Sequence, residues 1–190
     1  MCGIFGIITD HEQTLGPVLL QAGRRLAYRG YDSVGCATVA ADGVIDLRKG
    51  VGRIDDVGAR LEFTAMRGAR GITQLRWATF GAPSYENAQP HLDSDGDLVG
   101  AHNGNVVNNV QLRELFLREG LTVRGTNDGE SCIHAVERRF DRNGGDLGQA
   151  IISINVVAPA IVVILIYVLF RINRDEASVI DRARAAGESI

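Results

Sequence analysis

The sequence begins MCGIFGII (residues 1–8), in which a cysteine in second place is followed by a glycine and an apolar run rich in isoleucine. Residues of this kind favour a β-strand over residues 2–8, and Thr9 and Asp10 are expected to end it. Aminopeptidases generally remove an initiator methionine that precedes a small residue. We therefore expect Cys2 to be the first residue of the mature chain, so that its thiol and a free α-amine belong to one residue.

A cysteine at the N-terminus has a general base of its own. A free α-amine and a thiol lose their protons at similar pH, so the uncharged amine can accept the thiol proton directly or through a water molecule. This is the cysteine version of the N-terminal threonine arrangement. Taken alone, Cys2 is more often a small buried hydrophobe or a lipidated terminus. Other motifs in the chain are therefore needed to distinguish a catalytic cysteine from a buried or lipidated one.

Composition limits the classes of function. With 190 residues, of which 45% are hydrophobic, the chain can bury one core of ordinary size and form one domain with an appendage. A net charge of -3 provides no basic field for a nucleic-acid backbone, so we expect no nucleic-acid partner. Cys2, Cys36 and Cys132 are odd in number and far apart, which favours a reducing, cytoplasmic setting without a disulfide framework. They also lack the spacing of a zinc site, so we expect no metal.

Hydrophobic patterning predicts a mixture of strands and helices. Apolar positions at helical spacing predict an amphipathic helix over residues 12–26. Residues 36–47 are typical of a β-hairpin, and residues 71–75 and 98–102 are short buried-strand candidates that run into polar loops. Catalytic residues are often found in such loops at strand ends.

Two further helix starts are predicted by paired polar residues. Asn108 with Gln111, and Asn127 with Glu130, have the spacing of capping boxes. Strands and helices therefore mix without a clean β-α-β alternation. This order predicts an α+β layered fold and not a doubly wound parallel sheet.

Six segments resemble the class II glutamine amidotransferases, N-terminal-nucleophile hydrolases that release ammonia from glutamine. Their order and approximate spacing both fit, which is more specific than any one motif. The segments are MCGIFGI at the start, LAYRGYDSVG at 26–35, LRWATFG at 75–81, NAQPH at 87–91, AHNGN at 101–105 and TNDGES at 126–131. The second and third look most like the glutaminase domain of glucosamine-6-phosphate synthase, whereas the fourth and fifth are also similar to amidophosphoribosyltransferase. The resemblance implies an αββα sandwich and no cofactor.

The acyl-transfer chemistry of that family needs donors aimed at the oxyanion of a tetrahedral intermediate. Asn103 and Gly104 could provide one side-chain amide and one backbone N–H. The resemblance assigns this role to them, with Cys2 as the nucleophile. An Asn-Gly turn after a strand is a common structural feature in its own right. The two interpretations are compatible, because such a turn would present the donors.

Free glutamine carries a carboxylate and an ammonium group, so a specific site needs one fixed cation and one fixed anion. Arg76 suits the carboxylate because its planar guanidinium can bind both oxygens. By resemblance, Trp77 and Thr79 line the same pocket on a loop that closes over the substrate, and Asp128 binds the ammonium. Without the resemblance, Arg76 would be interpreted as a surface ion-pair partner, Trp77 as a core residue and Asp128 as a helix first-turn acid.

The resemblance assigns supporting roles to two residues, and one position differs from the family pattern. Arg29 and Gly30 occupy the YRG turn and by resemblance position the N-terminus, whereas Asp32 could simply satisfy that turn. Phe80 stands where the sugar-synthase pattern usually has histidine. This departure weakens the transfer of any role for that side chain, including coupling to a second domain, and leaves the carboxylate clamp intact.

The resemblance covers residues 1 to about 145, and we assign a glutaminase domain to residues 1–149. Residues 150–170 form an uncharged run long enough to cross a bilayer as a helix. Isoleucine and valine, with Asn155 and Pro159, fit two buried core strands equally well. Residues 171–190 are then a polar tail or a terminal helix. The membrane alternative would anchor a cytoplasmic catalytic domain to the inner or plasma membrane and leave the sandwich incomplete.

Two functions from different classes follow. In the first, Cys2 hydrolyses glutamine through a thioester, without a metal or cofactor, and ammonia passes to an acceptor-binding synthase subunit. In the second, the chain is a non-catalytic glutamine-binding or assembly module, membrane-tethered or truncated. The first function is favoured because the sequence contains a residue for every expected role: nucleophile, oxyanion donors, cation and anion. The apolar segment favours the second.

Overall fold

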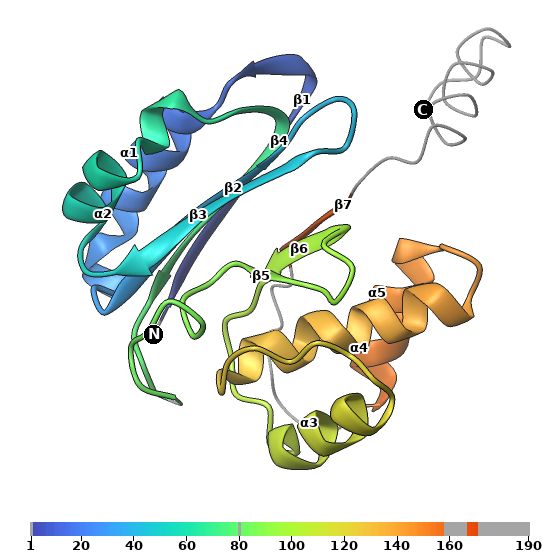
Figure 1. Ribbon diagram of the computed structural model, residues 1–190. Helices are drawn as coiled ribbons and strands as arrows, with labels where there is room; N and C mark the ends of the chain where they lie inside the picture. Colours follow the sequence, from blue (N-terminus) through green and yellow to red (C-terminus); the bar gives the residue numbers. More distant parts are fainter. Residues whose placement is uncertain (1, 80, 158–166, 171–190) are drawn as a thin grey trace, which may run out of the picture.

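The computed structural model describes residues 2–79, 81–157 and 167–170 (Figure 1). Within these residues the chain alternates between strands, α-helices and two short 3-10 helices, η1 and η2. Their order is β1 (Gly3–Thr14), α1 (Gly16–Leu26), η1 (Ala27–Arg29), β2 (Ser33–Val39), β3 (Ile45–Val51), α2 (Ile54–Arg60), η2 (Phe63–Ala65), β4 (Arg67–Arg76), β5 (His91–Leu92), β6 (Leu98–Ala101), α3 (Asn109–Arg118), α4 (Asp128–Arg142), α5 (Leu147–Val157) and β7 (Tyr167–Phe170).

The strands form two antiparallel sheets. The first has the order β1-β4-β2-β3, and the second has the order β5-β6-β7. In the first sheet, Gly3 is the partner of Leu75, so the start of β1 lies beside the end of β4. This register brings Cys2 to the loop that follows Arg76.

Helices cover the outer faces of both sheets, which gives four layers. Figure 1 shows α1 and α2 on one side of the paired sheets and α3, α4 and α5 on the other. Three apolar clusters separate the layers: one beneath α1 and α2, one between the sheets, and one beneath α4 and α5. Their central members are, in that order, Leu15, Leu19, Phe63 and Met66; Ala37, Ile72 and Val99; and Leu98, Val136 and Ala150. The predicted α+β layered fold is confirmed.

Strand β2 shows why the layers stack in this way. All seven of its residues are buried. Successive strand side chains point to opposite faces, so Val34 and Cys36 join the cluster beneath α1, whereas Ala37 and Val39 join the cluster between the sheets. A strand that is apolar on both faces needs cover on both sides.

The boundaries of the first two elements differ from those predicted. Strand β1 does not end at Ile8 but continues to Thr14, because Gln13 and Thr14 pair with β4 after an irregularity in register. Helix α1 therefore begins at Gly16 and not at residue 12. Gln13 and Thr14 are held by their pairing with β4, which local helical spacing cannot reveal.

Only one of the two predicted helix caps forms. The Asn127 side chain accepts a hydrogen bond from the Gly129 N–H, as expected for a cap on α4. Asn108 precedes α3 but makes no side-chain capping bond. Glu130 does not reach back to Asn127 either. Its two oxygens instead accept the backbone N–H groups of Arg124 and Gly125, at 2.7 Å each.

The apolar segment at 150–170 combines helix and strand in its described parts. Its first residues belong to α5, which packs through Ala150 against α4, and Tyr167–Phe170 form β7 beside β6. The described parts of this segment fit neither a single helix nor a pair of strands, because one end is helical and the other is a strand. The boundary assigned at residue 149 falls inside α5. Residues 158–166 and 171–190 lie outside the described residues, and no helix within the described ranges is long and apolar enough to span a membrane.

The capping difference predicts unequal effects of two matched substitutions. Asn127→Ala should lower the free energy of unfolding by about 1 kcal/mol or more, because the cap is lost. The variant also leaves the buried His91 ring without its contact to the Asn127 Oδ1, at 3.1 Å. Asn108→Ala should be close to neutral. Urea denaturation followed by circular dichroism measures both, and equal losses in the two variants would contradict this account.

Glu130 is a buried carboxylate with several partners. Besides the two backbone N–H groups, it lies 3.6 Å from the Arg113 Nη1 and 3.8 Å from the His134 Nε2. Burial alone would raise the pKa of Glu130, but the His134 ring and the backbone donors outweigh burial and lower the pKa to about 2. The folded state therefore favours the ionised form.

The lowered pKa of Glu130 predicts a specific pH dependence. Unfolded chains protonate this carboxyl near its ordinary pKa of 4.5, whereas the folded chain holds the charge down to about 2. Its contribution to stability is complete above pH 4.5 and is lost as the pH falls through that window. The stability difference between wild type and Glu130→Gln should therefore shrink as urea unfolding is repeated from neutral to acidic pH. A difference that stays constant would show that the charge contributes nothing.

Candidate active site

The Cys2 thiol lies at the end of β4. The Trp77 backbone N–H donates to the Cys2 Sγ at 3.4 Å, and the thiol lies 3.7 Å from the Trp77 carbonyl oxygen. This position follows from the pairing of Gly3 with Leu75 across β1 and β4. The predicted nucleophile and the predicted substrate loop are therefore neighbours, although 75 positions separate Cys2 and Trp77 in the chain.

Two of the predicted residues hold the Cys2 backbone. The Arg29 Nε donates to the Cys2 carbonyl oxygen at 3.0 Å, and the Asn103 Nδ2 donates to the same oxygen at 2.9 Å. A side-chain amide has two N–H donors, so this bond leaves Asn103 one further donor. Gly104 follows it on an exposed part of the loop after β6. The Cys2 carbonyl oxygen is therefore fixed by two side chains.

Gly30 is a glycine because its α-carbon lies against the end of β4. A Cβ at this position would lie 2.6 Å from the Arg76 carbonyl carbon and 2.8 Å from the Leu75 oxygen. Side chains of any other residue would push the YRG turn away from the strand. The resemblance assigned Gly30 a supporting role, and this close approach gives a physical reason for one.

Asp32 does more than satisfy its own turn. Its backbone N–H donates to the Arg76 carbonyl oxygen at 3.1 Å, and its Oδ2 accepts the Ala78 N–H at 2.7 Å. Asp32 thus holds the first residues of the loop that was predicted to close over the substrate. The YRGYDS motif contained this residue, but its local turn chemistry hid the long-range contact.

The substrate-loop residues differ in exposure. Arg76 is buried, and its Nη2 donates to the Gly81 carbonyl oxygen at 2.7 Å, so the loop wraps around the guanidinium. Trp77 is 43% exposed and its ring lies 5.5 Å from that of Tyr31, centroid to centroid. Thr79 is exposed on the same loop. Phe80 lies outside the described residues.

Asp128 is a buried acid at the start of α4. Its Oδ2 accepts the Val106 N–H at 2.9 Å, which ties α4 to the loop that carries Asn103. Burial lowers the pKa of the Arg76 guanidinium, and the nearby Cys2 and Asp128 oppose that effect. The predicted cation therefore lies in the same region of the structure as the predicted anion and nucleophile.

Two further residues of this region escaped the sequence reasoning. Asn87 and Gln89 both belong to the NAQPH motif, which was used only to identify the family. Both are buried, and both bind the backbone of the loops that carry site residues. Among the described residues, no group of three or more His, Cys, Asp or Glu side chains could hold a metal ion.

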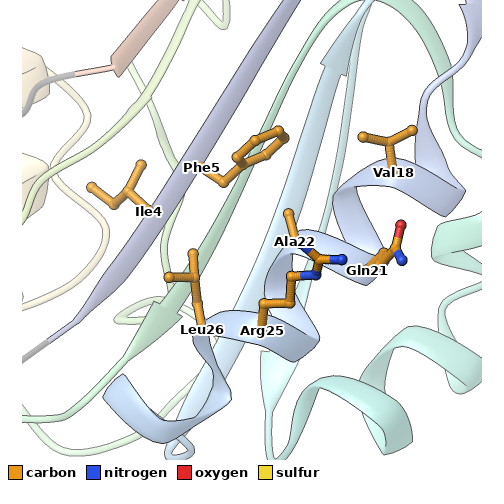
Figure 2. A pocket seen from close by; sticks show the side chains of 7 residues that line it. All are labelled: Ile4, Phe5, Val18, Gln21, Ala22, Arg25 and Leu26. Carbon is orange, nitrogen blue, oxygen red and sulfur yellow. The ribbon is translucent and has the colours of Figure 1, made fainter.

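An open groove of about 410 Å³ lies elsewhere on the domain, between β1 and α1 (Figure 2). Its lining is mostly apolar, with one cation at Arg25, and consists of Ile4, Phe5, Val18, Gln21, Ala22, Arg25 and Leu26. The lining contains no carboxylate that could bind an ammonium group. The predicted cation and anion, Arg76 and Asp128, do not line this groove.

Comparison with known proteins agrees with this arrangement. Residues 75–152 match the family model described as a glutamine amidotransferase domain. The glutamine–fructose-6-phosphate aminotransferase (isomerizing) of Methanothermobacter thermautotrophicus is 43% identical over 150 residues, which cover 79% of this chain and 25% of that protein. The enzyme of the same name from Thermococcus kodakarensis is 42% identical over 140 residues, covering 74% and 23%. The chain thus spans about a quarter of the length of these curated relatives.

Two solved structures share the fold of this chain. The glutamine phosphoribosylpyrophosphate amidotransferase of B. subtilis, solved with ADP and GMP, superposes with a TM-score of 0.67 at 23% identity, covering 90% of this chain and 35% of that one. A structure described as the allosteric regulatory enzyme of purine biosynthesis has a TM-score of 0.69 at 26% identity, covering 88% and 35%. In sequence and in fold alike, the chain belongs to the class II glutamine amidotransferases.

Proposed function

We propose that this chain hydrolyses the side-chain amide of glutamine, with Cys2 as the nucleophile. After removal of Met1, the α-amine of Cys2 accepts the thiol proton, and the thiolate attacks the amide carbon. The tetrahedral intermediate collapses as ammonia leaves with a proton from the α-ammonium, and a thioester to Cys2 remains. Water, deprotonated by the same amine, attacks the thioester, and glutamate is released as the thiol is restored.

The main support for this proposal is the pair of hydrogen bonds that the Cys2 carbonyl oxygen accepts. Arg29 and Asn103 come from distant parts of the chain and both donate to that one atom. An ordinary buried cysteine needs no such fixation of its backbone, whereas a nucleophile must be held in one geometry. The second N–H of Asn103 and the backbone N–H of Gly104 supply the oxyanion donors.

Substrate selection rests on Arg76 and Asp128. The Arg76 guanidinium binds the carboxylate of glutamine, and Asp128 binds its ammonium group. The Arg76 Nη2 also donates to the Gly81 carbonyl oxygen, so carboxylate binding and the position of Gly81 are coupled. Trp77 and Thr79 line the pocket from the same loop.

Ammonia released here needs an acceptor. The relatives are named glutamine–fructose-6-phosphate aminotransferases, and this chain corresponds to about a quarter of their length. We propose that an acceptor-binding synthase domain or subunit receives the ammonia. Without an acceptor, the ammonia would be lost to solvent and the nitrogen of glutamine would not be used.

We also propose that the described residues form an incomplete αββα sandwich. Strand β1 pairs with β4 on one side and is an edge strand among the described strands. The apolar groove of Figure 2 borders this strand. An open edge beside apolar lining is the place where a further strand would complete the sheet.

Intact mass gives the first test of the nucleophile. Incubation with 6-diazo-5-oxo-norleucine, a glutamine analogue with an electrophilic diazoketone, should add one covalent adduct to a chain that has lost Met1. Cys2→Ala should gain none, and Cys36→Ala is the matched control, because Cys36 is buried in the core and should not affect labelling.

Several outcomes would contradict the enzyme proposal. Retained Met1 removes the base, and labelling that survives in Cys2→Ala places the reactive group elsewhere. A folded wild-type chain that binds glutamine without forming an adduct would favour a non-catalytic binding module.

Asp128→Asn tests the ammonium site. The amide keeps the size of the side chain and can still accept the Val106 N–H, but the charge is lost. We expect kcat/KM for glutamine to fall about 10- to 100-fold, the value of a hydrogen bond to a charged group. Hydrolysis of glutaramate, which is glutamine without its α-amine, should be little affected.

The preference of the wild type for glutamine over glutaramate should therefore collapse in Asp128→Asn. Asp95→Asn, on an exposed turn, is the matched control and should retain the preference. An equal loss on both substrates would show that Asp128 has only a structural effect.

A further inference from the structure

The loop that carries the oxyanion donors is held by one buried amide side chain. Strand β6 ends at Ala101, so the sheet ladder does not fix the residues that follow. The Gln89 Oε1 accepts the His102 backbone N–H at 2.7 Å, and the Gln89 Nε2 donates to the His102 carbonyl oxygen at 3.1 Å. His102 is the residue directly before Asn103.

This pairing requires an amide. The backbone of one residue offers one donor and one acceptor, and a glutamine side chain offers the matching acceptor and donor. A carboxylate would place a second negative oxygen against the His102 carbonyl. Gln89 is only 2% exposed, so the loss of either bond would leave a buried polar group without its partner.

Gln89 is itself fixed by its surroundings. The start of α4 packs on its amide, since a Cβ at Gly129 would lie 3.0 Å from the Gln89 Cδ and Nε2. On one side of it, the Lys49 Nζ donates to the Ala88 carbonyl oxygen at 2.7 Å. Two positions before it, the Asn87 Oδ1 accepts the backbone N–H of Asn127 at 3.0 Å. The segment is therefore a rigid support between the sheets and α4.

We propose that Gln89 is a positioning residue for the oxyanion donors. By fixing both backbone groups of His102, its amide sets where the Asn103 side chain and the Gly104 N–H lie relative to Cys2. Gln89 acts through the loop and touches no reacting atom. This inference rests on the proposed glutaminase function. It adds a residue that positions the groups proposed to bind the oxyanion.

Steady-state kinetics of Gln89→Glu and Gln89→Asn test this role. The first keeps the size of the side chain without the donor, and the second keeps the amide but shortens its reach. Both should lower kcat about 10- to 100-fold, the cost of a small misplacement of catalytic groups, with KM for glutamine little changed. Gln111→Glu, on the exposed face of α3, is the matched control.

A double-mutant cycle separates positioning from loss of stability. Once Asn103→Ala has removed the side-chain donor, Gln89→Glu should cost much less in kcat than it does in the wild-type background. Full additivity of the two effects, or wild-type kcat in both Gln89 variants, would overturn the inference. An inactive wild type would instead overturn the proposed function.

Amide hydrogen exchange tests whether Gln89 holds this loop, and it does not require an activity assay. In the wild type, the His102 N–H should be strongly protected, although it lies beyond the end of β6. Protection at residues 102–104 should fall in either Gln89 variant while that of β4 is retained. A His102 amide that exchanges at the rate of an exposed loop in the wild type would show that Gln89 does not hold this loop, whatever the variants do.

Discussion

The pairing of β1 with β4 is the constraint on which the rest of the site depends. It sets Gly3 opposite Leu75, so the residue before β1 meets the residues after β4. A slip of one residue would turn the Cys2 side chain to the other face of the sheet. The apolar layers on both faces resist such a slip, because Ile4 and Phe5 belong to clusters on opposite sides of the sheet. The core of the domain therefore fixes the place of the thiol.

The loops around Cys2 are ordered by polar side chains and not by the sheets. Asp32 holds the loop after β4, Asn87 holds the residues before α4, and Asp128 binds the loop after β6. Each of these side chains accepts backbone N–H groups that no strand or helix would satisfy. Buried loop backbone needs such partners, since an unpaired buried N–H is costly. The polar residues of the motifs thus serve both the folding of the loops and the placement of the reactive groups.

Sequence reasoning predicted the layered fold, and it singled out Arg29 and Asn103, which contact Cys2, because both results depend on local patterns. Short apolar runs and a hairpin pattern marked the strands, and the motif segments identified Arg29, Arg76, Asn103 and Asp128. Local patterns failed where long-range pairing decides. Gln13 and Thr14 fall in the predicted helix but pair with β4, and Asn108 has a capping partner at the right sequence spacing but makes no cap. The contacts of Gln89 and Asp32 join segments far apart in the chain, so no short motif could reveal them.

The central claim is that Cys2, the oxyanion donors and the two charged groups form one glutamine site. A crystal structure of the chain after reaction with 6-diazo-5-oxo-norleucine tests it most directly. The account predicts an adduct on the Cys2 Sγ, with its carbonyl oxygen beside Asn103 and Gly104, its carboxylate at Arg76 and its amine at Asp128. An adduct whose carboxylate and amine lie away from Arg76 and Asp128, or a ligand bound only in the groove between β1 and α1, would contradict the account.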